Sequence, residues 1–90
     1  MAWRIDIDDK AKKELAGLDR AQAKRIATFL HERVAKLDDP RSIGEALKGS
    51  KFGDFWKYSV GDYRIIASIE DIALLILVVR IGNRKDVYRK

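Results

Sequence analysis

Basic and aromatic side chains gather in the C-terminal half of this 90-residue sequence, in an order suited to handling a phosphodiester. Lys57 and Arg64 flank the dipeptide Gly61-Asp62, which predicts that they lie on the two arms of a tight hairpin. A further group follows the last apolar run: Arg84, Lys85, Tyr88 and Arg89. Arginine holds phosphate through paired N–H donors, and a tyrosine ring stacks on an unpaired base. We expect these side chains to converge on one face as a basic patch that contains an aromatic ring.

Such a patch has the groups needed to cut RNA without a metal. The 2′-hydroxyl must lose a proton and attack the adjacent phosphorus, and fixed guanidinium groups stabilise the negative charge of the transition state. A lysine whose pKa is lowered by neighbouring cations can act as the base. The sequence has no cysteine and one histidine, His31, so zinc sites of the usual type and histidine-based triads lack their parts. We therefore expect no cofactor and no metal site.

Composition indicates one small globular domain over residues 1–90, with 47% hydrophobic and 37% charged residues. Net charge is +5, and it is concentrated in the C-terminal half: residues 46–90 carry nine Lys/Arg against five Asp/Glu, and residues 1–45 carry ten against nine. This asymmetry favours a polyanionic partner. The first residues have no signal-peptide pattern, and the longest apolar run, Ile72–Val79, is too short to span a bilayer. We expect a cytoplasmic protein without a membrane partner.

Alternating apolar and polar residues predict a strand over 3–7, and Asp8 or Asp9 can cap a short helix that follows it. Gly17 lies near the end of that helix, where a residue with positive φ is useful. A second helix is expected from Asp19 to about Asp38, closed by Asp39-Pro40. Its start has a capping-box-like spacing, and its apolar positions recur at helical spacing: Ala23, Ile26, Phe29, Leu30, Val34 and Leu37.

The C-terminal half predicts a loop over 41–53, with a turn around residues 45–47, and then three strands. The strands are expected at 55–60, 63–69 and 72–81, with a turn at Glu70-Asp71 and a break at Gly82-Asn83. The third is apolar at both odd and even positions, which indicates a central strand at least partly covered on both faces. The order is therefore β-α-α-β-β-β. It predicts an α+β domain in which a small, largely antiparallel sheet carries an N-terminal α-hairpin on one face.

This order and three stretches of sequence resemble the RelE/ParE toxin superfamily. The stretches are Leu47–Gly49, Phe55–Ile66 and Val79–Arg89, and the N-terminal elements fit as well. The resemblance implies a toxin activity and an antitoxin encoded alongside. On the RelE pattern, Arg64 resembles the arginine that stabilises the phosphate and Arg84 the one that helps the leaving group or the transition state. Tyr88 resembles the tyrosine that positions the base.

Lys57 matches one of two strand lysines of the RelE pattern, which stand two residues apart. The other lysine is absent here: its place falls on Ser59 in one register and on Phe55 in the other. Lys57 remains the candidate base, and Lys48, Lys51 or Lys85 could substitute for it. Lys48, Lys51, Lys85 and Arg89 are also candidate RNA-binding residues. The stretch after Gly82 is two residues shorter than in that pattern, and Asn83 stands where some relatives have a histidine.

The leading hypothesis is a type II toxin that cuts messenger RNA on the ribosome and is neutralised by a RelB-like antitoxin. Basic surface around the helices would dock ribosomal RNA, and operator DNA would be reached only through the antitoxin complex. A ParE-like gyrase inhibitor is the second hypothesis, because that branch shares the fold and needs no nuclease residues. A third is a catalytically weak toxin that acts only within an antitoxin and operator-DNA complex.

Overall fold

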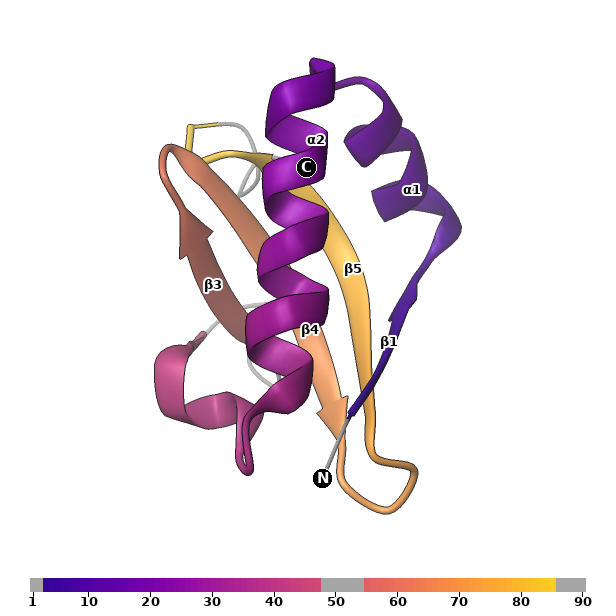
Figure 1. Cartoon of the computed structure of the whole chain (residues 1–90), viewed down its shortest axis with the longest axis vertical. Helices are drawn as coiled ribbons and strands as arrows, with labels where there is room; N and C mark the ends of the chain where they lie inside the picture. The colour runs from indigo at the N-terminus through magenta and orange to yellow at the C-terminus, as the bar shows by residue number, and fades with distance from the viewer. Residues whose placement is uncertain (1–2, 48–54, 86–90) are drawn as a thin grey trace.

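The computed structural model describes residues 3–47 and 55–85 (Figure 1). The chain begins with strand β1 (Arg4–Ile7) and helices α1 (Asp9–Ala16) and α2 (Arg20–Thr28). Three short helical segments follow: the π-helical η1 (Phe29–Arg33) and the 3₁₀ segments η2 (Val34–Lys36) and η3 (Pro40–Ile43). The remaining elements are strands: β2 (Glu45–Ala46), β3 (Trp56–Val60), β4 (Tyr63–Glu70) and β5 (Leu75–Asn83).

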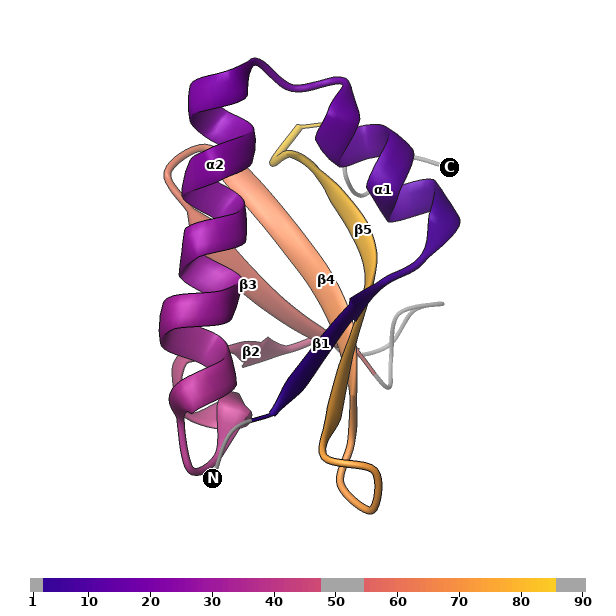
Figure 2. The same ribbon diagram turned by 45° about the vertical axis from the view of Figure 1, so that its right-hand side comes forward.

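The five strands of the described residues form one sheet in the order β1-β5-β4-β3-β2, in which β1 and β5 pair in parallel and the other neighbours pair antiparallel. Both helices lie on the same side of this sheet (Figure 2). The predicted α+β class, the helix pair on one face and the central place of the last strand are therefore confirmed. The sheet also has a strand that sequence reasoning missed. Residues 45–46 were expected in a turn, but they pair with Lys57 and Trp56 as the edge strand β2.

Local capping signals set the starts of both helices. The Asp8 carboxylate accepts the N–H of Ala11 at 2.9 Å, and the Asp19 carboxylate accepts the N–H of Gln22 at 2.9 Å. Each cap satisfies a backbone donor that the first turn leaves free. The expected positive φ at Gly17 is wrong, because its φ is −80° and its N–H bonds back to the last carbonyls of α1.

The second helix ends at Lys36 rather than Asp38, and a π-helical turn interrupts it over Phe29–Arg33. Its three fully buried residues, Ile26, Leu30 and Val34, are spaced by four. In an α-helix each residue advances by about 100°, so a spacing of four drifts by about 40° per step. The wider π turn offsets this drift and keeps all three side chains on the sheet.

Strand β5 differs from its predicted bounds at both ends. Residues 71–74 form the turn, Ile72 is fully exposed at 104%, and the strand continues through Gly82 and Asn83, which were expected to break it. A register shift lies opposite Ile66/Ala67: Ile66 pairs with Arg80 and Ala67 with Val78, so Val79 has no partner. This bulge explains why apolar residues occur at both parities, since Ile76 and Val78 are buried on one side of it and Ile81 on the other.

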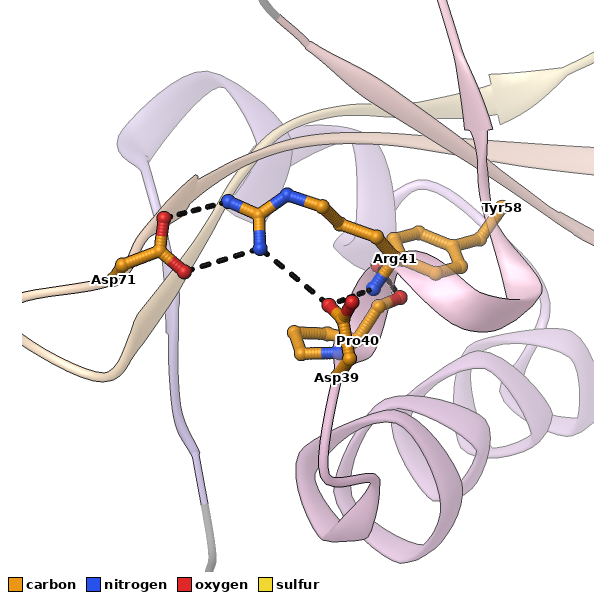
Figure 3. Close-up of polar contacts among 5 residues, drawn as sticks. All are labelled: Asp39, Pro40, Arg41, Tyr58 and Asp71. Atoms are coloured by element: carbon orange, nitrogen blue, oxygen red, sulfur yellow. Dashed lines mark hydrogen bonds and ion pairs between the residues drawn. The ribbon is translucent and has the colours of Figure 1, made fainter.

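The core lies between the helices and the sheet and contains Trp3, Ala11, the buried side chains of α2, η1 and η2, and most of the buried side chains of the strands. Polar contacts hold the η3 segment against β3 and the β4–β5 turn (Figure 3). The buried Tyr58 hydroxyl donates to the Pro40 carbonyl at 2.5 Å. Arg41 donates to both carboxylate oxygens of Asp71 at 3.0 and 2.7 Å, and its guanidinium carbon lies 5.9 Å from the Trp56 ring centre. These contacts join the segment before β2 to the β4–β5 turn.

Candidate functional site

The β3–β4 hairpin positions Arg64. Gly61 has a φ of 59°, a left-handed conformation that suits glycine in a tight turn, as the Gly61-Asp62 signal predicted. Arg64 pairs with Ser59 on β3 and with Gly82 on β5. Directly paired residues point to the same side of a sheet. Arg64 is therefore flanked on the two neighbouring strands by small residues, Ser59 and Gly82.

Burial shows on which face of the sheet Arg64 lies. The adjacent row, Tyr58, Ile65 and Ile81, is buried in the core beneath the helices. Because side chains alternate along a strand, the Arg64 row lies on the opposite face. The Arg64 Nη1 donates to the carbonyls of Gly61 and Tyr63, both at 3.0 Å. These neutral acceptors hold the guanidinium at the hairpin tip without cancelling its charge.

The end of β5 lies against the same hairpin tip. The backbone N–H of Arg84 donates to the Asp62 carbonyl at 2.9 Å, and the N–H of Lys85 donates to the Asn83 side-chain oxygen at 3.0 Å. A pocket of about 210 Å³ is lined by Asp62, Asn83, Arg84 and Lys85. Two segments twenty residues apart thus meet at one end of the molecule, where the hairpin tip and the end of β5 are seen together in Figure 1.

Ion pairing distinguishes the cations at this end of the molecule from Lys57 and Lys36. Within residues 3–47 and 55–85, no carboxylate lies within ion-pair distance of Arg64, Arg84 or Lys85. These two lysines do have carboxylate partners: Lys57 pairs with Glu45 at 3.5 Å, and Lys36 pairs with Glu32 at 3.1 Å. We name Arg64, Arg84 and Lys85 the tip cluster. Cations without carboxylate partners make a ready site for an anion.

Lys57 stands apart from the tip cluster, although the register places it on the same face as Arg64. It lies two residues along β3 from Ser59, about 7 Å away at the rise of a strand. It also lines a separate cavity of about 240 Å³ at the β3 edge, with Phe29, Arg33 and Ile43 among the other lining residues. The charged group that it contacts is a carboxylate and not a cation. Among the described residues, the ion-pair partner of Lys57 is therefore a carboxylate, and one further cation, Arg33, lines the same cavity.

Four predicted site residues lie outside the described residues: Lys48, Lys51, Tyr88 and Arg89. The lysine of the RelE pattern that is missing here would stand at Ser59 or at Phe55. Of these two positions, Ser59 lies directly opposite Arg64. Asn83 closes the turn after β5 through its bond to the Lys85 N–H.

Sequence reasoning overlooked a further contact that fixes the end of β5. Beyond Val78, where its pairing with β1 ends, the N–H of Ile81 donates to the Glu14 carboxylate at 2.9 Å. The same carboxylate accepts the Arg80 Nε at 3.1 Å, with the two side chains only 14% and 23% exposed. The signal was present in the sequence, since Arg80 is the one charged residue in the run 72–81.

The described residues contain no group of three or more His, Cys, Asp or Glu side chains placed to hold a metal ion. No helix among them has the length and apolar character to cross a membrane.

Comparison with known proteins identifies the family. The family model described as the ParE toxin of the type II toxin–antitoxin system parDE matches residues 5–88. The chain belongs to this family of toxins, within the RelE/ParE superfamily. A search of curated proteins found no significant match.

Solved structures show the same fold. The RelE–RelB complex of Pyrococcus horikoshii matches with a TM-score of 0.74 at 26% identity, covering 96% of this chain and 99% of that one. The intact RelBE complex of E. coli matches with a TM-score of 0.70 at 25% identity, covering 91% and 96%. The RelBE2 complex of Mycobacterium tuberculosis has a TM-score of 0.84, covering 96% and 95%, and its 17% identity supports likeness of fold alone.

Proposed function

We propose that this toxin is a metal-independent endoribonuclease that cuts messenger RNA on the ribosome. The observation that carries the proposal is the tip cluster: two arginines and a lysine without carboxylate partners in the described residues, at a hairpin whose Arg64 is flanked by Ser59 and Gly82. A site that binds a phosphodiester needs this combination of fixed positive charge and free space.

In this mechanism Arg64 holds the scissile phosphate and stabilises the charge that develops on it. Arg84, beside the hairpin tip, assists the leaving oxygen, and Lys85 adds charge. We assign Tyr88 to stacking on the substrate base, and Lys48, Lys51 and Arg89 to RNA binding, as the RelE resemblance implies. Because Lys57 pairs with Glu45, a charge ligand is a better role for it than the base. That leaves Lys48, Lys51 and Lys85 as the other candidates for the base.

A RelB-like antitoxin is the proposed partner, with operator DNA bound only through the antitoxin complex. The support is that the solved relatives from Pyrococcus horikoshii and E. coli are complexes of RelE with RelB. The substrate, messenger RNA on ribosomes, would place the free toxin in the cytoplasm.

The test is a translating extract in which messenger RNA is mapped by primer extension. The wild-type protein should create new ends at codon-defined positions, and Arg64→Ala with Arg84→Ala should abolish them. A matched control removes two cations that do have carboxylate partners, Arg4→Ala with Lys36→Ala, and should keep the cleavage. Cleavage that survives loss of both tip arginines would refute the site.

Gyrase inhibition is the second candidate, because the matching family model is described as ParE. That activity needs no phosphodiester chemistry from the toxin. A DNA supercoiling assay separates the two candidates: inhibition of gyrase together with intact messenger RNA would favour it over the nuclease.

A further inference from the structure

A fourth cation reaches the hairpin tip from the helical side of the molecule. Arg25 lies on α2 beside Lys24. In the structure its guanidinium lies against Gly61. A Cβ atom added to Gly61 would lie 3.2 Å from the Arg25 Nη1 and 3.6 Å from its Cζ. Glycine at position 61 therefore leaves space for the Arg25 side chain and also permits the positive φ of the turn. Figure 1 shows α2 running beside this hairpin.

Two guanidinium groups thus approach one residue from different elements. The Gly61 carbonyl accepts a hydrogen bond from Arg64 on β4, while Arg25 on α2 lies against the same glycine. Arg25 is exposed and has no ion pair or side-chain hydrogen bond within residues 3–47 and 55–85. Like charges gathered without counter-ions are unfavourable in the free protein, and a bound polyanion relieves their repulsion.

The two arginines lie on different sides of the turn. Arg64 is on the sheet face away from the helices, whereas Arg25 comes from the helix layer. A single phosphate at the tip end of the sheet face away from the helices would be reached by Arg64, and a neighbouring phosphate on a strand that passes around Gly61-Asp62 would be reached by Arg25. We propose that Arg25 binds a phosphate of the substrate RNA next to the one held by Arg64, so that the RNA strand bends around the hairpin tip. The inference deepens the proposed function and rests on it.

The test is binding of a labelled ten-nucleotide single-stranded RNA, made uncleavable by 2′-O-methyl groups, at several salt concentrations. For single strands, each lost phosphate contact lowers the slope of log K against log salt by about 0.7. Arg25→Gln should lower the slope by about that amount and weaken binding roughly three- to tenfold at low salt, and Arg25→Ala should do the same. Arg25→Lys should restore the slope.

Lys24→Ala is the matched control, since Lys24 is the adjacent residue of α2, is exposed, and has no carboxylate partner in the described residues. It should leave the slope nearly unchanged. Equal effects of the Arg25 and Lys24 variants, or no effect of either, would overturn the role of Arg25 while leaving the nuclease proposal standing. A wild-type protein that binds no RNA at any salt concentration would overturn the Arg25 contact, whereas the nuclease proposal is decided separately by the primer-extension assay. Unchanged unfolding midpoints would show that the variants are folded.

Discussion

The buried hydroxyl of Tyr58 provides a test of how the fold holds the segment before β2. Its side chain is 1% exposed, and its hydroxyl donates to the Pro40 carbonyl (Figure 3). Tyr58→Phe removes this donor and leaves a buried carbonyl without it, which costs about 1 to 2 kcal/mol. For a domain of this size that loss corresponds to a fall in unfolding temperature of roughly 5 to 15 °C.

The same substitution should have a distinctive pH dependence. Burial raises the pKa of Tyr58 to about 12 from an ordinary value of 10.0. The folded state favours the neutral phenol. The stabilisation that the Tyr58 hydroxyl gives to the folded state is therefore fully present below pH 10 and is lost as the pH rises toward 12. This difference in pKa corresponds to about 3 kcal/mol. The wild-type advantage over Tyr58→Phe should therefore vanish near pH 11, and the phenylalanine variant should be the more stable one at pH 12.

Urea unfolding followed by the fluorescence of Trp3 and Trp56, at pH 8 to 12, measures this directly. Comparing the two proteins cancels the contributions of other titrating groups. Tyr63→Phe is the matched control, because the Tyr63 hydroxyl has no hydrogen bond in the described residues, and it should change stability by less than about 0.5 kcal/mol at pH 8. A wild-type advantage over Tyr58→Phe that stays constant from pH 8 to 12 would refute the reasoning.

Two further substitutions test contacts between distant segments. Glu14→Ala removes the acceptor of the Ile81 N–H and the partner of Arg80, and should lower the free energy of unfolding by about 1 to 3 kcal/mol in urea titrations. An unchanged midpoint would show that water replaces the carboxylate. The hydrogen bonds from Arg41 lower the pKa of Asp71, so their stabilisation is present above pH 4 and is lost as the pH falls further. Asp71→Asn should therefore unfold at a lower temperature than the wild type at pH 7 and at nearly the same temperature at pH 2. A difference that persists at pH 2 would contradict this.

Local rules predicted the parts of the fold that depend on neighbours in sequence. The caps at Asp8 and Asp19 and the turn at Gly61-Asp62 each follow from a few adjacent residues. Sequence failed where distant segments decide the geometry. Strand β2 exists only because Glu45 and Ala46 meet β3, and the β5 bulge is visible only in the pairing with β4.

The candidate site likewise has features that follow from the sequence and features that only the tertiary structure decides. Sequence by itself determined the class of fold, the RelE/ParE family and the residue types able to bind a phosphodiester, because these follow from pattern, spacing and resemblance. Only the tertiary structure decided which cations have carboxylate partners and which do not. Lys57 and Arg80 form ion pairs with acids from other elements, while Arg64, Arg84 and Arg25 lie around the hairpin tip and form no ion pair in the described residues. The physical reason is that charge pairing depends on the register of the strands and the packing of α1 and α2, which no local run of residues encodes.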